Sequence, residues 1–185
     1  MPDLVDLADA KAEMIRVLGS SATRRQHVRG VARTAANACR LLRTSEIVVS
    51  AAWLHDIGYA PELAATGLHS LDGARYLRTA GAEDRICRLV ANHTHAWLEA
   101  EGRGLAEVLA AEFPAEHSLT ADVLTYADLT TSPTGESIGV EARIAEILRR
   151  YPSDDVVHCS IANAAPELIA TVRRVEAALA AAQPR

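Results

Sequence analysis

Cysteine is scarce in this sequence of 185 residues, and its distribution excludes two classes of small protein. The three cysteines, Cys39, Cys87 and Cys159, lie far apart, are odd in number and form no CxxC spacing. A disulfide framework needs paired cysteines, and a zinc ribbon needs closely spaced ones. We therefore expect neither, and we interpret Cys39 and Cys87, which fall within helical patterns, as buried thiols.

Long apolar runs and a strong charge of one sign are also lacking. No stretch approaches the roughly 18 consecutive apolar residues of a membrane span, and the acidic, amphipathic start MPDLVDLADAKAEMIRVL differs from a signal peptide. The net charge of −5 includes no large basic field, which argues against a nucleic acid polymer as partner. We expect a cytoplasmic protein that binds neither membranes nor nucleic acid polymers. Its oligomeric state stays open.

Aromatic residues make up only 4% of the sequence, and Ala, Leu, Arg and Glu dominate, which favours helices over strands. Gly19 is expected to close the first helix, and Pro166 to open the last one. Apolar residues recur at helical spacing between short breakers and predict helices over residues 3–18, 23–42, 47–54, 69–79, 82–95, 105–112, 118–132, 139–151 and 166–181. We predict an all-α bundle that forms a single domain over residues 1–185, with a core of about 23–132 and C-terminal helices of about 139–181 packed on it.

The segment AAWLHDIGYAPEL contains a doublet that a purely structural helix does not need. The apolar run from Ala51 to Leu54 ends at His55 and Asp56, and Gly58 follows. Neighbouring helical residues point about 100° apart, but this constraint relaxes in the last turn, where both side chains can reach one ion. Gly58 then lets the chain turn away sharply.

Four more histidines lie near predicted helix ends: His27, His69, His93 and His95. Asp128 lies in the apolar context TYADLT, where a buried carboxylate is costly unless it is paired or bound to a cation. Imidazole and carboxylate together suit iron, manganese, cobalt or zinc. Taken singly, His27 also fits a surface residue or cap, His69 the end of a turn, and Asp128 a loop cap.

In this order, and in an all-helical sequence, His27, His55-Asp56 and Asp128 resemble the motif of the HD superfamily of metal-dependent phosphohydrolases. HDIG is the form found in one of its main branches. The resemblance spans about residues 23–132 and includes HSLDGARYL at 69–77 and ANHTH at 91–95. Within the superfamily, the chain is loosely similar to the bacterial HD-type hydrolases of dinucleoside polyphosphates.

The resemblance implies one or two divalent ions and cleavage of a phosphoester or phosphoanhydride of a nucleotide-like small molecule by metal-activated hydroxide. Asp56 is a candidate bridge between two ions and the candidate catalytic residue that orients water. His95 is open between a ligand in place of His93, a neighbour of the ligands, a substrate contact and a surface residue. The resemblance implies a first metal site formed by His27, His55, Asp56 and Asp128, and a second site to which His69 and His93 are added. The candidate phosphate contacts are Arg24, Arg25, Arg29 and Arg75. Each of these arginines is equally consistent with a solvated surface residue.

Two departures from the family pattern bear on the substrate. The first arginine after Asp128 is Arg143, later than we expect in a dinucleoside polyphosphate hydrolase, and GYAPEL is an incomplete cyclic-di-GMP phosphodiesterase signature. Some HD proteins with the same ligands hold a mixed-valence di-iron centre and oxidise a small organic substrate with dioxygen, so an oxygenase is the alternative function. A non-catalytic nucleotide sensor is disfavoured because all six candidate ligands are present.

Overall fold

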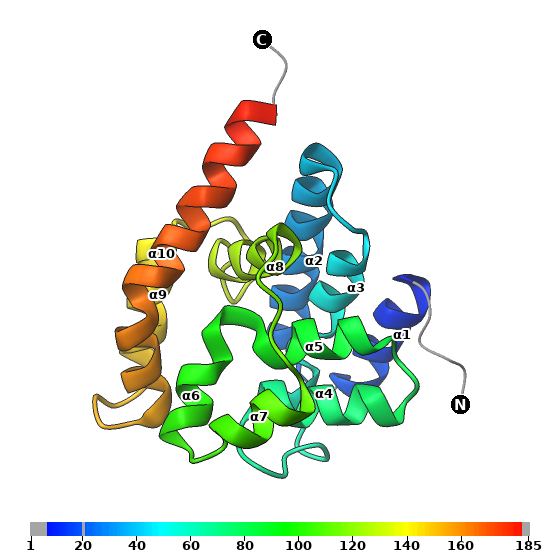
Figure 1. The fold of residues 1–185 in the computed structure, drawn as a ribbon, viewed down its shortest axis with the longest axis vertical. Helices are drawn as coiled ribbons and strands as arrows, with labels where there is room; N and C mark the ends of the chain where they lie inside the picture. The colour runs from blue at the N-terminus through cyan, green and yellow to red at the C-terminus, as the bar shows by residue number, and fades with distance from the viewer. Residues whose placement is uncertain (1–6, 20, 183–185) are drawn as a thin grey trace.

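The protein folds into helices that pack around a short central helix, α3 (Figure 1). The structure is a computed structural model and describes residues 7–19 and 21–182. Within these residues no strand occurs, and the only β-type pairing is an isolated bridge between Thr131 and Ser137, so the predicted all-α fold is confirmed. The helices are α1 (Leu7–Val17), α2 (Ala22–Leu42), α3 (Ile47–Leu54), α4 (His69–Thr79), α5 (Asp84–Asn92), α6 (Ala96–Gly102), α7 (Ala106–Glu112), α8 (Leu119–Leu129), α9 (Val140–Arg150) and α10 (Val156–Ala182), with short 3-10 turns η1 (Ile57–Tyr59) and η2 (His93–His95).

Helix α3 lies at the centre because it is apolar nearly all round. It contacts α1, α2, α5 and α8, and Val48, Ala51, Ala52 and Leu54 are buried. Burial of a side chain such as Leu54 contributes roughly 1.5–3 kcal/mol. The doublet His55-Asp56 therefore comes directly after a helix that is held firmly in the core.

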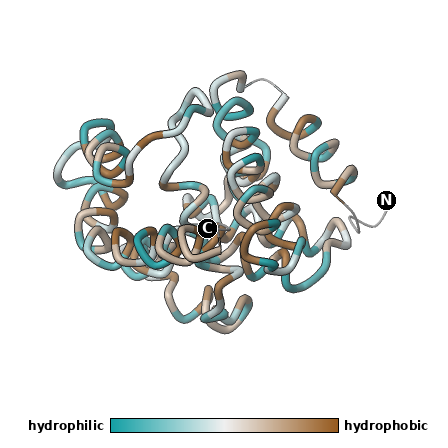
Figure 2. Tube along the Cα trace, turned by 90° about the horizontal axis from the view of Figure 1, so that it is seen from above, coloured by the Kyte–Doolittle hydropathy of each residue, from teal (hydrophilic) through white to brown (hydrophobic). Residues whose placement is uncertain are grey.

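The surrounding helices are amphipathic, and brown and teal segments alternate along their tubes in Figure 2. Their apolar faces form a large core cluster from α1 to α8 and a smaller one that includes Leu129, Val140, Ile144 and Leu168. The smaller cluster attaches α9 and α10 to the end of α8. This attachment forms one wall of the candidate site.

The predicted helices differ from the observed ones in three main places. The helix predicted over 82–95 ends at Asn92, because Thr94 and His95 have left-handed backbone angles of φ 52° and 56°. Helix α6 was not predicted at all. Helix α10 begins at Val156, and Pro166 lies inside it rather than at its start. Proline in a helix interior costs one backbone hydrogen bond, but the stripe formed by Ala164, Leu168 and their buried neighbours outweighs that local preference.

A close backbone contact fixes the loop after α8 against α2. A Cβ at Gly30 would lie 2.6 Å from the Gly135 carbonyl oxygen, and one at Gly135 would lie 2.5 Å from the Gln26 carbonyl oxygen. Gly135 also has a φ of 84°, a conformation that favours glycine. Side chains are thus excluded here, and the loop lies close enough for the Ser132 carbonyl to reach His27.

No helix among the described residues combines the length and the apolar character that a membrane crossing requires.

Candidate metal centre

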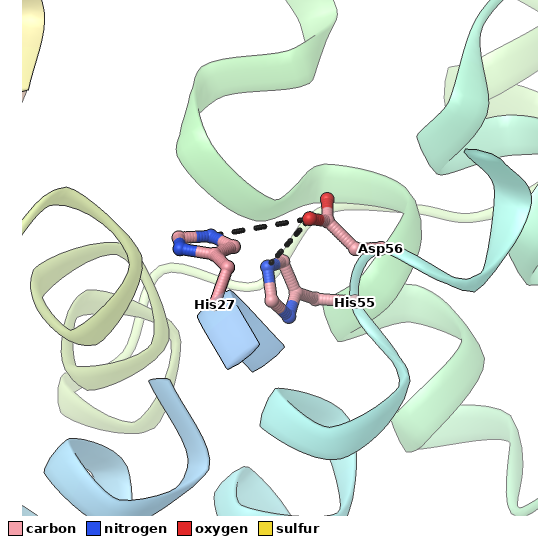
Figure 3. A group of neighbouring side chains, drawn as sticks. All are labelled: His27, His55 and Asp56. Atoms are coloured by element: carbon pink, nitrogen blue, oxygen red, sulfur yellow. Dashed lines mark ion pairs between the residues drawn. The ribbon is translucent and has the colours of Figure 1, made fainter. Parts of the chain in front are cut away.

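The six predicted ligands come from separate helices and turns and converge in one place. Their donor atoms form three overlapping groups, in each of which the atoms lie within 4.8 Å of one another: His27, His55 and Asp56; His55, His93 and Asp128; Asp56, His69 and His93. Five of the six residues are buried, and His69 is partly exposed. Figure 3 shows the rings of His27 and His55 facing the same oxygen of the Asp56 carboxylate, Oδ2.

A second glycine contact brings Asp56 to His69. A Cβ at Gly58 would lie 1.9 Å from the His69 carbonyl oxygen and 2.7 Å from the Gly73 nitrogen, so turn η1 lies directly on the first turn of α4. His69 Nε2 consequently lies 3.7 Å from Asp56 Oδ1. Only glycine permits this approach of two backbones.

Three of the histidines are held by backbone carbonyls through Nδ1. A carbonyl oxygen only accepts hydrogen bonds, so Nδ1 must carry the proton, and Nε2 of the neutral ring keeps its lone pair. This is the arrangement that metal-bound histidines in proteins usually have. The bonds join His27 to Ser132 at 3.0 Å, His55 to Ala52 at 2.8 Å and His93 to Val90 at 2.6 Å.

The free Nε2 atoms point at carboxylate oxygens. His27 Nε2 lies 3.0 Å from Asp128 Oδ1, and His55 Nε2 lies 3.5 Å from Asp56 Oδ2. His55 is fully buried, and its Nε2 has no hydrogen-bond partner. Two acceptors that face each other without water need a proton or a cation between them.

The remaining two histidines, His69 and His93, also direct Nε2 atoms toward one another and toward Asp56. His69 Nε2 and His93 Nε2 lie 3.3 Å apart, and both are near Asp56. Two atoms bonded to the same ion at about 2.1 Å lie roughly 3.0–3.5 Å apart. The donor set therefore fits one or two divalent cations, and a mixture of imidazole and carboxylate suits iron, manganese, cobalt or zinc.

The protonation states suit cation binding. Burial lowers the pKa of His55, and burial together with His93 lowers the pKa of His69 to about 3, so both rings are neutral at pH 7. Burial also opposes protonation of His27, but the hydrogen bond and the charge of Asp128 prevail and raise the pKa of this ring. Without a cation, Asp128 thus favours the protonated form of the His27 ring.

Both carboxylates are ionised. Burial opposes the ionisation of Asp56, but His55 and the Arg24 guanidinium favour it, and the pKa of Asp56 lies well below its usual range. Burial likewise opposes the ionisation of Asp128, whereas the hydrogen bond from His27 prevails and lowers its pKa. Two buried anions thus lie among lone-pair donors.

Further side chains orient the candidate ligands. Thr94 Oγ1 donates to Asp128 Oδ2 at 2.5 Å, and Arg24 Nη1 donates to Asp56 Oδ2 at 2.7 Å. Tyr59 stacks between Arg24 and His69, at 3.8 Å from the guanidinium carbon and 4.0 Å from the imidazole centroid. Thr94 and Tyr59 were missed by the sequence analysis, and a lone threonine between two histidines carries no motif that points to it.

The predicted substrate residues do not all reach the centre. Arg24 and His95 line the cavity beside it, although His95 belongs to none of the three donor groups and its Nδ1 lies 3.6 Å from Glu167. Arg29 is exposed, because it lies two residues after His27 and thus about 200° around α2. Arg75 faces away and forms an ion pair with Glu112.

Arg25 also lies elsewhere, since its guanidinium donates to the backbone carbonyl of Leu18 at 3.2 Å. The structure instead brings Arg143 and Arg150 of α9 to the cavity. The cavity has a volume of about 80 Å³, and beside these arginines α9 and α10 contribute the apolar residues Ile147, Val157, Ile161 and Ala164. Arginines are thus present at the centre, but two of them come from a helix well beyond Asp128 in sequence.

Comparison with known proteins gives one match. The model of a family described as HD domain matches residues 24–151, which covers the helices that carry all six candidate ligands. No curated protein and no solved structure matches the chain.

Proposed function

The chain belongs to the HD domain family, and on this premise we propose that it is a metal-dependent hydrolase that cleaves a phosphoester or phosphoanhydride bond of a small molecule. The observation that carries the proposal is the fully buried Nε2 of His55, which has no hydrogen-bond partner and faces the Asp56 carboxylate. Such an arrangement is costly for a protein unless a cation neutralises it. That this substrate is a nucleotide stays a prediction from the family resemblance.

The residues that would hold the cation are His27, His55, Asp56 and Asp128, with His69 and His93 completing a second position. A divalent cation supplies Lewis-acid activation of water and of a phosphoryl group. In the hydrolysis, the oxygen of water bonds to phosphorus, the bond to the leaving group breaks, and a water proton passes to the leaving oxygen.

Asp56 is the residue best arranged to orient the attacking water. Its carboxylate belongs to two of the three donor groups, one with His27 and His55 and one with His69 and His93, and Arg24 donates to its Oδ2 at 2.7 Å. The Arg24 guanidinium is itself fixed on the Tyr59 ring. This chain of contacts limits the rotation of the carboxylate, and a positioned group transfers a proton more effectively than a mobile one.

The cavity favours an anionic substrate over a neutral one. Arg24, Arg143 and Arg150 all line a space of about 80 Å³, and guanidinium groups suit phosphate through charge-assisted hydrogen bonds. The alternative, a mixed-valence di-iron oxygenase, uses the same six ligands. Activity retained with manganese under strict exclusion of oxygen supports the hydrolase, whereas product formation that requires oxygen supports the oxygenase.

Substitution of the doublet tests the proposal directly. We expect His55→Ala and Asp56→Ala to lose bound metal and phosphatase activity together, because each removes a donor shared by two groups. The measurements are metal content by mass spectrometry and turnover on a panel of phosphomonoesters, nucleotides and dinucleotides. His117→Ala is the matched control, since His117 lies exposed on the loop before α8. Full metal content and full turnover in either doublet variant would contradict the proposal.

A further inference from the structure

Arg143 is an unusually buried cation beside the candidate metal centre. Only 6% of its side chain is exposed, and it lies in α9 among the apolar residues Val140, Ile144 and Ile147. A buried guanidinium is costly unless its donors are satisfied. The position therefore calls for an anion.

The hydrogen bonds of Arg143 leave one edge of its guanidinium unused. Nη1 donates to Glu146 Oε2 at 2.5 Å. On the other edge, Nε is buried without a partner, and Nη2 lies 3.9 Å from Asp128 Oδ1, beyond hydrogen-bond distance. The unused edge thus lies on the side of the metal centre.

The same edge binds carboxylates elsewhere in this chain. Arg75 uses Nε and Nη2 to contact both oxygens of Glu112, and Arg85 does the same with Glu116. This planar pair of donors matches two oxygens of a carboxylate or a phosphate. In Arg143 the same two donors, Nε and Nη2, form no hydrogen bond with the described residues.

All three arginines of the cavity have acidic partners. Arg24 is paired with Asp56, and Arg150 donates to both oxygens of Glu146, at 2.6 and 2.7 Å. Glu146 therefore holds Arg143 and Arg150 together from outside the centre. Arg24 and Arg143 each use only Nη1 in a hydrogen bond, but Arg143 is the one of the three whose Nε is buried without a partner among the described residues.

The dimensions of the cavity restrict what is attached to such an anion. About 80 Å³ is small beside the roughly 300–1,000 Å³ of common ligand pockets. The lining of the cavity also includes the apolar side chains of Ile147, Ile161 and Ala164. A phosphate with one substituent fits this space better than one with two.

We propose that Arg143 is the specificity residue that binds two oxygens of a terminal phosphate group through Nε and Nη2, that Glu146 is its positioning residue, and that the substrate is a phosphomonoester with a small apolar substituent. The inference rests on the proposed function for the reaction but not for the binding of phosphate. Arg143 contacts the phosphate of the substrate, while the apolar side chains of the lining contact the substituent.

The first test uses metal-loaded full-length protein and inorganic phosphate as the probe. Phosphate affinity by calorimetry should fall roughly 10- to 100-fold in Arg143→Met, because a bidentate charged contact is lost. Arg149→Met, which removes the same charge from an exposed neighbour, should bind phosphate like the unchanged protein. Equal affinity in both variants overturns the inference, whether or not the protein is a hydrolase.

The second test separates Arg143 from the metal centre. Arg143→Met and the more conservative Arg143→Lys should keep the metal content of the unchanged protein, and their KM for a small phosphomonoester should rise more than kcat falls. Glu146→Gln should raise KM less than Arg143→Met does. Loss of metal in Arg143→Lys, or an unchanged KM in every variant, overturns the specificity role.

The third test concerns the substrate class. A small aryl or alkyl phosphate should have a higher kcat/KM than a nucleoside monophosphate, a dinucleoside tetraphosphate or a phosphodiester. If a diester or a dinucleotide is the best substrate, the proposed hydrolase stands and the substrate inference is overturned. If no phosphate compound is cleaved, the proposed function fails, and the calorimetric comparison of the methionine variants still decides the role of Arg143.

Discussion

The two sides of the candidate site are held in different ways. On the ligand side, backbone carbonyls hold Nδ1 of His27, His55 and His93, so these rings are as fixed as the main chain. On the α9 side, Arg143 and Arg150 are held by the side chain of Glu146. The geometry of the ligand side is thus fixed by the main chain. On the α9 side, by contrast, a side chain can be substituted without moving the main chain.

The comparison teaches that metal binding and substrate choice can be altered independently. A change on the ligand side disturbs a donor and its carbonyl partner together. A change on the α9 side alters charge and shape in the cavity but leaves the donor groups in place. The next three predictions either separate the two sides further or show that they act as one.

Removal of the cation should have the largest effect. We expect chelation to lower the free energy of unfolding by about 4 kcal/mol for an ion held at a thousand times its dissociation constant. The reason is that the buried carboxylates lose their counterion. Thermal unfolding with and without a chelator measures this difference, which His27→Ala should abolish and Arg150→Met should retain. A melting temperature that does not respond to chelation would mean that the donors hold no ion.

Removal of one orienting hydroxyl should have a smaller effect. Thr94→Gly relieves the left-handed backbone of a β-branched residue at φ 52° but removes the hydrogen bond to Asp128. Loss of an outer partner of a ligand typically costs 10- to 100-fold in metal affinity, roughly 1.4–2.8 kcal/mol. Competition with a metal-sensitive dye measures the affinity. Thr94→Ser keeps the hydroxyl and serves as the control; if it binds metal as weakly as Thr94→Gly, the hydroxyl is not the cause.

Acid should destabilise the chelated protein gradually. Because the pKa of His69 is lowered to about 3, the unfolded chain binds a proton between about pH 6.5 and pH 3 that the folded chain does not. The free energy of unfolding should therefore fall with decreasing pH, by up to about 1.4 kcal/mol per pH unit from this group.

The pH window separates this effect from that of the other groups. The raised pKa of His27 acts at higher pH and in the opposite direction, and the carboxylates act below their ordinary pKa. Urea titrations at several pH values between 4.5 and 6 give the free energy of unfolding as a function of pH. This free energy should depend less steeply on pH in His69→Gln than in the unchanged protein. Identical slopes would assign the acid sensitivity to another group.

The sequence was a good guide wherever the decisive interactions are local. Helices α2, α3 and α4 have almost the predicted bounds, because their apolar periodicity, Gly58 and the breakers all act within a few residues. The convergence of His27, His55-Asp56 and Asp128 also followed from a motif with a defined order. Their role as metal ligands stays a prediction.

The failures concern contacts between distant segments. Arg143 reaches Asp128 only because α9 folds back on the end of α8, and nothing near Arg143 in sequence indicates that turn. Pro166 lies inside α10 because packing against α8 outweighs a local preference. The break at Thr94 and His95 is likewise unreadable from residue types, since neither residue favours positive φ as glycine does.

The close contact of Gly58 with the first turn of α4 decides which donor atoms gather around Asp56. His27, His55 and Asp56 form one donor group without any residue of α4. His69 lies near Asp56 only because the absence of a side chain at Gly58 lets η1 approach α4 closely. We therefore expect any side chain larger than hydrogen at position 58 to separate η1 from α4 and to remove His69 from the donor group that it forms with Asp56 and His93.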